Sequence, residues 1–219
     1  MSLAGAACLP FIAFLLAGPV PQALLLALAA YLVAAVLAAG LMNRSYPYAD
    51  LGLANLVTLT RLLLTSALLA PLAASAPAER ILAVAIVVLA LDGIDGWLAR
   101  RQGRESAFGA RFDMEVDAFL GLVLALNAWA AGNIGPVVLF LALPRYAFAA
   151  AGYLLPWMAA TLPERFGRKV VCVVQIVALI ALQLPTLAGK PALFIAAAAL
   201  VALAWSFGRD VLWLWRRRT

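Results

Sequence analysis

The feature that most limits what this chain can fold into is a succession of apolar segments, each close in length to a membrane span. Of the 219 residues, 67% are hydrophobic and only 12% are charged. A spanning helix needs about 20 mostly apolar residues, so this length accommodates roughly six to eight spans and little else. We therefore predict an all-α fold, a polytopic bundle of membrane helices. Breaks at Pro, Gly or charged residues place the expected helices near 4–17, 22–41, 54–74, 79–103, 108–131, 135–157, 167–185 and 191–215.

Residues 1–43 are predicted to form an extra apolar segment ahead of a six-helix core at 44–219. The run at 4–17 is short for a full span, and Gly18-Pro19-Val20-Pro21 separates it from the next run. The segment is compatible with a hairpin of two helices or with one helix preceded by an interfacial stretch, which gives seven or eight spans in total. No Lys or Arg precedes Arg44, so the charged start of a secretory signal is missing and we expect the segment to be retained.

Basic residues gather at alternate ends of the expected helices. They cluster after the fourth helix, after the sixth and at the end of the eighth, whereas the turns between carry only Arg80 or Lys190. Short cytoplasmic loops are enriched in Lys and Arg, so the clustered side is predicted to face the cytoplasm, in the plasma (inner) membrane. The clusters contain Arg100, Arg101, Arg104, Arg111, Arg165, Arg168, Lys169, Arg209, Arg216, Arg217 and Arg218.

The composition argues against two other kinds of site. The net charge is +6, but the basic residues form no single patch beside interleaved aromatic residues, so we expect no nucleic-acid partner. The two cysteines, Cys8 and Cys172, lie far apart in apolar stretches, which indicates neither a disulfide framework nor a metal-binding pair.

Acidic residues are concentrated in one short segment. Six of the ten Asp and Glu residues fall between positions 92 and 117. Asp92 and Asp95 are three residues apart and Asp113 and Asp117 are four apart, so each pair occupies one face of its helix. The Arg- and Gly-containing stretch 101–106 allows the chain to turn between the two helices. We therefore expect the four carboxylates to converge near the cytoplasmic rim of the bundle.

Four carboxylates at close range repel one another unless they are protonated or neutralised by cations. Their oxygen atoms suit Mg²⁺, Mn²⁺ or Ca²⁺, and the chain contains no His that would favour zinc. Two such ions would form a clamp for a pyrophosphate, as in phosphoryl transfer. Two alternatives stay open: a network of satisfied buried carboxylates, and a proton or ion path in a transporter.

The spacing of these residues resembles the signature of the CDP-alcohol phosphatidyltransferase family. The resemblance begins with the sequence Asp92-Gly-Ile-Asp95-Gly96-Trp-Leu-Ala99-Arg100 and continues with Gly109, Asp113 and Asp117 at the family's intervals. Upstream, Asn55-Leu-Val-Thr58-Leu-Thr-Arg61 is similar to the Asn-x-x-Thr-x-x-Arg pattern of the family's first helix.

The resemblance implies an activity and a set of site residues. The four aspartates would hold two divalent cations, Mg²⁺ or Mn²⁺, that grip the pyrophosphate of a CDP-linked lipid such as CDP-diacylglycerol. Asp117 would also be the general base that takes the proton from the acceptor hydroxyl. Family members often form homodimers within the membrane lipid. The residues expected around the nucleotide and its phosphates are Asn55, Thr58, Gly96, Ala99, Arg100 and Gly109.

Structural interpretations compete with these roles at three positions. Asn55 and Thr58 are also suited to capping the helix that follows them. Arg61 is also suited to extending its charged end to the membrane surface.

The acceptor alcohol is predicted from cations in the second half of the chain. Arg145, Arg168 and Lys169 would suit an anionic acceptor, although Arg168 and Lys169 are also explained by membrane orientation alone. The surrounding segments partly resemble phosphatidylglycerophosphate synthases, which favours glycerol 3-phosphate. Tyr146 and Val171 depart from that pattern, so inositol phosphate, serine, choline and phosphatidylglycerol stay open as alternatives.

Overall fold

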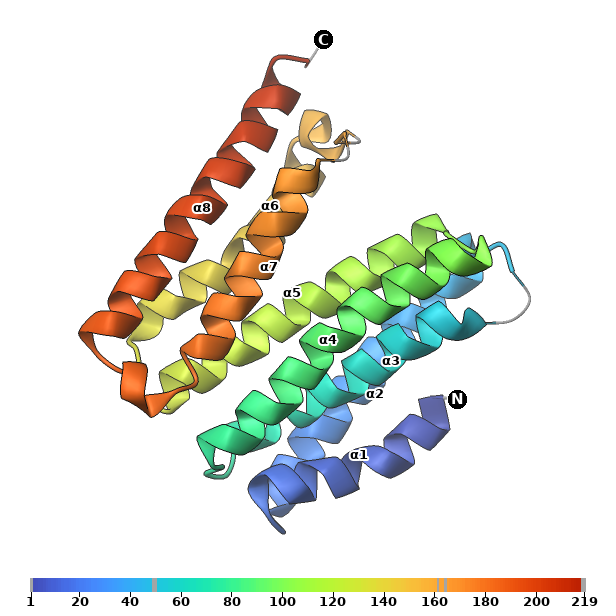
Figure 1. Cartoon of the computed structure of the whole chain (residues 1–219). Helices are drawn as coiled ribbons and strands as arrows, with labels where there is room; N and C mark the ends of the chain where they lie inside the picture. The colour runs from blue at the N-terminus through green and yellow to red at the C-terminus, as the bar shows by residue number, and fades with distance from the viewer. Residues whose placement is uncertain (1, 49–50, 161, 164, 218–219) are drawn as a thin grey trace. The chain divides into compact units, whose positions relative to one another are not determined.

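The computed structural model describes residues 2–48, 51–160, 162–163 and 165–217. These residues form eight α-helices and no β-strand, which confirms the all-α prediction (Figure 1). Short 3-10 turns follow or precede several of the helices. The helices are α1 (Ser2–Ala17), α2 (Pro21–Ser45), α3 (Gly52–Ala67), α4 (Ala78–Gln102), α5 (Ala107–Ala130), α6 (Leu139–Leu154), α7 (Phe166–Ala181) and α8 (Lys190–Trp215).

The helices coincide with the apolar runs of the sequence, as expected when Pro and Gly mark the turns. Five stretches of the described residues are long and apolar enough to cross a membrane, which confirms a polytopic membrane protein. They are Pro21–Met42, Gly52–Leu72, Ala78–Gln102, Pro136–Leu154 and Lys190–Trp215.

The chain forms two compact units that divide within α5, after Val123. The first unit contains α1 to α4 and the beginning of α5. The second contains the end of α5 and the helices α6 to α8.

In the first unit, α1 and α2 are two separate helices that pack against each other as a hairpin. Gly18 adopts a φ of +75°, which glycine reaches without strain, and Pro21 opens α2 where its missing N–H costs nothing. Small buried residues such as Ala13 and Ala27 let helices approach closely, and both helices of the hairpin pack against α3 (Figure 1).

The hairpin shares one core with the helices that carry the acidic residues. Leu9 and Tyr31, from α1 and α2, are fully buried in the same cluster as Leu62 of α3 and Phe108 and Phe112 of α5. The α3 helix also packs closely against α4. The extra N-terminal segment is therefore integral to the first unit.

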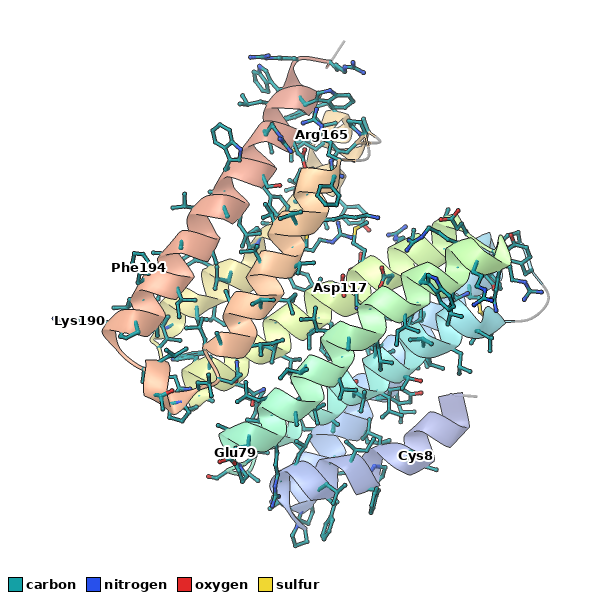
Figure 2. The ribbon with its side chains drawn as sticks, viewed as in Figure 1. Cys8, Glu79, Asp117, Arg165, Lys190 and Phe194 are labelled. Atoms are coloured by element: carbon teal, nitrogen blue, oxygen red, sulfur yellow. The ribbon has the colours of Figure 1, made fainter. Side chains whose placement is uncertain are left out.

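In the second unit, buried amide side chains join the helix ends. Asn133 donates to the carbonyl oxygens of Leu182 and Gln183, at 3.0 and 3.1 Å. Gln183 in turn donates to the carbonyl of Leu124 at 2.9 Å. These hydrogen bonds satisfy polar groups whose burial in an apolar surrounding would otherwise cost free energy. Arg165 and Lys190 lie at opposite ends of this unit, as Figure 2 shows.

Candidate active site

Three helices of the first unit carry the candidate site. On α3, Asn55, Thr58 and Arg61 recur at intervals of three residues and so share one face, and all three are buried. Asp92 and Asp95 lie on α4, and Asp113 and Asp117 lie on α5, where Figure 2 labels Asp117.

The turn between α4 and α5 is built by local capping. The α4 helix ends at Gly103, whose φ of +60° is the left-handed conformation that glycine favours at a helix C-terminus. Ser106 then accepts a hydrogen bond from the backbone N–H of Gly109 through its side-chain oxygen, at 3.0 Å, and so caps the start of α5. The chain thus reverses within a few residues, as the Arg- and Gly-containing stretch predicts.

The four aspartates converge on the guanidinium of Arg61. Its Nη1 atom donates to Asp95 Oδ2 at 2.7 Å and to Asp113 Oδ1. Its Nη2 atom pairs with Asp92 Oδ1 at 2.8 Å and donates to Asp117 Oδ1. The structure therefore brings together all four residues of the acidic motif.

The carboxylates are arranged as a candidate site for divalent cations. One oxygen each of Asp92, Asp95 and Asp113 lies within 4.8 Å of the other two. Asp117 lies beside this group, because it also pairs with the guanidinium of Arg61. When all four carboxyl groups are ionised, they exceed the single guanidinium by three negative charges, an excess that hard divalent ions neutralise. Oxygen donors, this spacing and this excess charge fit Mg²⁺ or Mn²⁺.

Asp95 is the most firmly held of the four. Its side chain is 4% exposed, against 30% for Asp92, 39% for Asp113 and 35% for Asp117. Thr58 donates to its Oδ2 at 3.0 Å, and the backbone N–H of Gly96 donates to its Oδ1 at 2.7 Å. The other three carboxylates are open enough to meet a ligand.

An open cleft of about 170 Å³ adjoins the carboxylates within the first unit. Asp95 and Asp113 reach its wall, and Arg104 and Tyr46 also line it. All six residues expected around the nucleotide line the cleft: Asn55, Thr58, Gly96, Ala99, Arg100 and Gly109.

Two glycines keep the cleft open. A Cβ atom at Gly109 would lie 3.2 Å from both Asn55 Oδ1 and Ser106 Oγ. A Cβ atom at Gly96 would lie 3.4 Å from the guanidinium of Arg100. The absence of side chains at these positions leaves space beside the polar groups of the cleft.

The structural interpretations of the α3 residues are wrong. The α3 helix begins at Gly52, ahead of Asn55 and Thr58, and its N-cap residue, Leu51, makes no side-chain capping bond. Asn55 instead donates to the carbonyl of Leu51 at 2.8 Å. Arg61 does not extend to a surface, because it is fully buried.

Sequence reasoning assigned no site role to Arg61, although a signal was present. Arg61 follows Asn55 and Thr58 at helical spacing, so a shared face was readable from the sequence. A cation inside an apolar run is also costly unless it is paired.

The residues predicted to bind the acceptor alcohol all lie in the second unit. Arg145 on α6 and Arg168 on α7 are partly buried, and Lys169 is exposed. Arg168 Nε pairs with Asp210 Oδ2 at 2.9 Å, and Asp210 on α8 is buried. The sequence prediction missed Asp210, which stands apart from the acidic cluster.

The helices and the site together define a membrane-embedded protein with a carboxylate centre beside an open cleft. The family model for CDP-alcohol phosphatidyltransferase matches residues 51–208, which include every residue of the acidic motif. The chain belongs to this family, as its motif predicts, and the family indicates CDP-alcohol phosphatidyltransferase activity with a general dependence on divalent metal. No curated protein and no solved structure matches the chain.

Proposed function

We propose that this protein moves the phosphatidyl group of CDP-diacylglycerol to an alcohol, releasing CMP, in phospholipid biosynthesis. The observation that carries the proposal is that the four motif aspartates lie together beside the cleft. All six residues expected around the nucleotide line this cleft. Family membership supplies the reaction class. The donor lipid, the acceptor and the individual residue roles belong to the proposal.

Asp92, Asp95, Asp113 and Asp117 would hold two divalent cations, Mg²⁺ or Mn²⁺. When bound, such ions supply positive charge that attracts the pyrophosphate and stabilises the leaving phosphate. The buried pairing of Asp95 with Thr58 keeps this carboxylate in place before the substrate arrives. The partial exposure of Asp117 leaves it accessible to an acceptor.

Asp117 is the proposed general base. Its carboxylate takes the proton from the acceptor hydroxyl, and the hydroxyl oxygen forms a new bond to the phosphorus attached to the lipid. The bond from that phosphorus to the bridging oxygen breaks, and the electron pair leaves with CMP. No His is present in the chain, so a carboxylate is the natural base for this step.

The cleft would bind the CDP part of the donor. Arg100 and Arg104 line it and offer cationic donors to the phosphates, while Asn55 and Thr58 offer polar groups from α3. Gly96, Ala99 and Gly109 leave space for the nucleotide beside the helix backbones.

Glycerol 3-phosphate is the proposed acceptor, bound through Arg145, Arg168 and Lys169. The ion pair with Asp210 supports this role for Arg168, because a buried carboxylate fixes the direction of the guanidinium. Inositol phosphate, serine, choline and phosphatidylglycerol are alternatives with the same chemistry. We further propose that the protein is a homodimer in the plasma (inner) membrane, with the active site on the cytoplasmic side.

The test is CMP release from CDP-diacylglycerol by the purified protein in detergent with Mg²⁺ or Mn²⁺. The panel of acceptors is glycerol 3-phosphate, inositol phosphate, inositol, serine, choline and phosphatidylglycerol. We expect release with one acceptor, glycerol 3-phosphate. Release with another acceptor would keep the reaction and replace the alcohol. No release with any acceptor, together with no metal-dependent CDP binding, would contradict the enzyme and favour a transporter.

A further inference from the structure

Arg61 makes an unusual set of contacts for a single side chain. It is fully buried on α3, and its two terminal nitrogens reach all four motif carboxylates. Each nitrogen joins one carboxylate of α4 to one of α5: Nη1 joins Asp95 to Asp113, and Nη2 joins Asp92 to Asp117. A guanidinium carries four N–H groups on these nitrogens, one for each carboxylate.

This arrangement has an electrostatic consequence. Without a cation between them, four carboxylates on two helices would push α4 and α5 apart. A single buried guanidinium attracts all four and links both helices to α3. A buried charge network of this kind is strongly destabilised when one partner is removed, because the remaining charges are left uncompensated.

We propose that Arg61 is a positioning residue that acts as a built-in counter-ion, holding the four carboxylates together whenever divalent metal is absent. The inference rests on the proposed metal-binding role of the aspartates. The proposal also predicts that the guanidinium of Arg61 and a divalent ion compete, because both bind the same carboxylates. Metal should therefore stabilise the protein more strongly when the charge of Arg61 is removed.

The test compares thermal unfolding of the wild type and Arg61→Met in detergent, once in EDTA and once in Mn²⁺. Intrinsic fluorescence of the six Trp residues reports unfolding. In EDTA we expect the midpoint of Arg61→Met to fall by roughly 10 °C. In Mn²⁺ we expect the variant to regain much of this loss, so its metal-induced rise exceeds that of the wild type.

A matched control is Arg80→Met. Arg80 is an exposed arginine of the same unit that donates to the carbonyl of Leu15 at 2.7 Å, away from the aspartates. Its substitution should leave the metal-induced rise unchanged. Equal losses for Arg61→Met in EDTA and in Mn²⁺ would mean that Arg61 only fills space, and a smaller metal-induced rise would mean that it assists metal binding. Either result would overturn the proposal.

A second comparison needs no metal. Asp117→Asn removes one negative charge, so in EDTA it should raise the midpoint more in the Arg61→Met background than in the wild type. Equal effects in both backgrounds would contradict a counter-ion role.

If Arg61→Met is not recovered, Arg61→Lys replaces it. An ammonium offers three N–H groups to four carboxylates, so this variant should give the same signs with smaller shifts. None of these measurements uses a substrate, so a failure of the proposed transferase reaction would leave them interpretable.

Discussion

Thr58 on α3 donates a hydrogen bond to Asp95 on α4 across 3.0 Å, between two side chains that are both almost fully buried. This bond holds the least exposed of the four carboxylates in a fixed direction. In the proposed metal site, a residue that orients Asp95 in this way contributes to metal affinity without touching the metal.

Thr58→Val should therefore weaken metal binding. The side chain keeps its shape but loses the donor, so Asp95 is less firmly oriented, and we expect affinity for Mn²⁺ to fall roughly 10-fold. Titration of the thermal midpoint with Mn²⁺ measures this change. Thr60→Val is the matched control, because Thr60 is exposed on the same helix and donates only to the carbonyl of Leu56. Equal affinities for the two variants would contradict the orienting role.

Gly109→Ala should narrow the cleft. The added methyl group would meet Asn55 Oδ1 and Ser106 Oγ at 3.2 Å, so both must shift. We expect affinity for CMP in the presence of Mn²⁺ to fall about 10-fold, a cost of about 1.4 kcal/mol. Gly40→Ala on α2 is the control, because nothing lies within 4 Å of its added Cβ atom. Unchanged CMP affinity in Gly109→Ala would place the nucleotide elsewhere.

Arg168→Gln should impair use of an anionic acceptor. Loss of a charged hydrogen-bond donor costs about 1.5–3 kcal/mol, which corresponds to a rise in KM for glycerol 3-phosphate of roughly 10- to 100-fold. Asp210→Asn should give a smaller rise, because it frees Arg168 without removing it. Initial rates at varied acceptor concentration measure both effects, and Lys190→Gln is the control at the opposite end of the unit. A rise in the KM for CDP-diacylglycerol instead would assign Arg168 to the donor.

The N-terminal hairpin should become less stable when one of its small buried residues is enlarged. Ala27→Phe places a large ring where the side chain is fully buried, so we expect a loss of about 1–3 kcal/mol in the free energy of unfolding. Val36→Phe on the same helix faces outward and is 70% exposed, so it should be nearly neutral. Thermal unfolding in detergent measures both. Equal stabilities would show that the hairpin is not part of the core.

Much of the fold was predictable because apolar runs and their Pro and Gly breaks set helix positions directly. The convergence of Asp92 and Asp95 with Asp113 and Asp117 was predictable because spacing within a helix fixes its faces. The pairing of Arg61 with the four aspartates was not predicted. Its spacing from Asn55 and Thr58 indicated a shared helix face, but spacing alone does not say whether that face turns to the surface or into the bundle. The ion pair of Arg168 with Asp210 joins distant helices, and nothing local in the sequence records it.

We propose that the four-aspartate site performs the transfer, with Asp117 as its base. The most direct measurement compares initial rates of CMP release from CDP-diacylglycerol by the wild type, Asp117→Asn and Glu115→Gln. Glu115 lies two residues from Asp117, outside the motif, and provides a matched loss of one carboxylate. We predict that Asp117→Asn lowers the rate roughly 10²- to 10⁴-fold while Glu115→Gln stays close to the wild type. A folded Asp117→Asn protein that releases CMP at the wild-type rate would rule out Asp117 as the base.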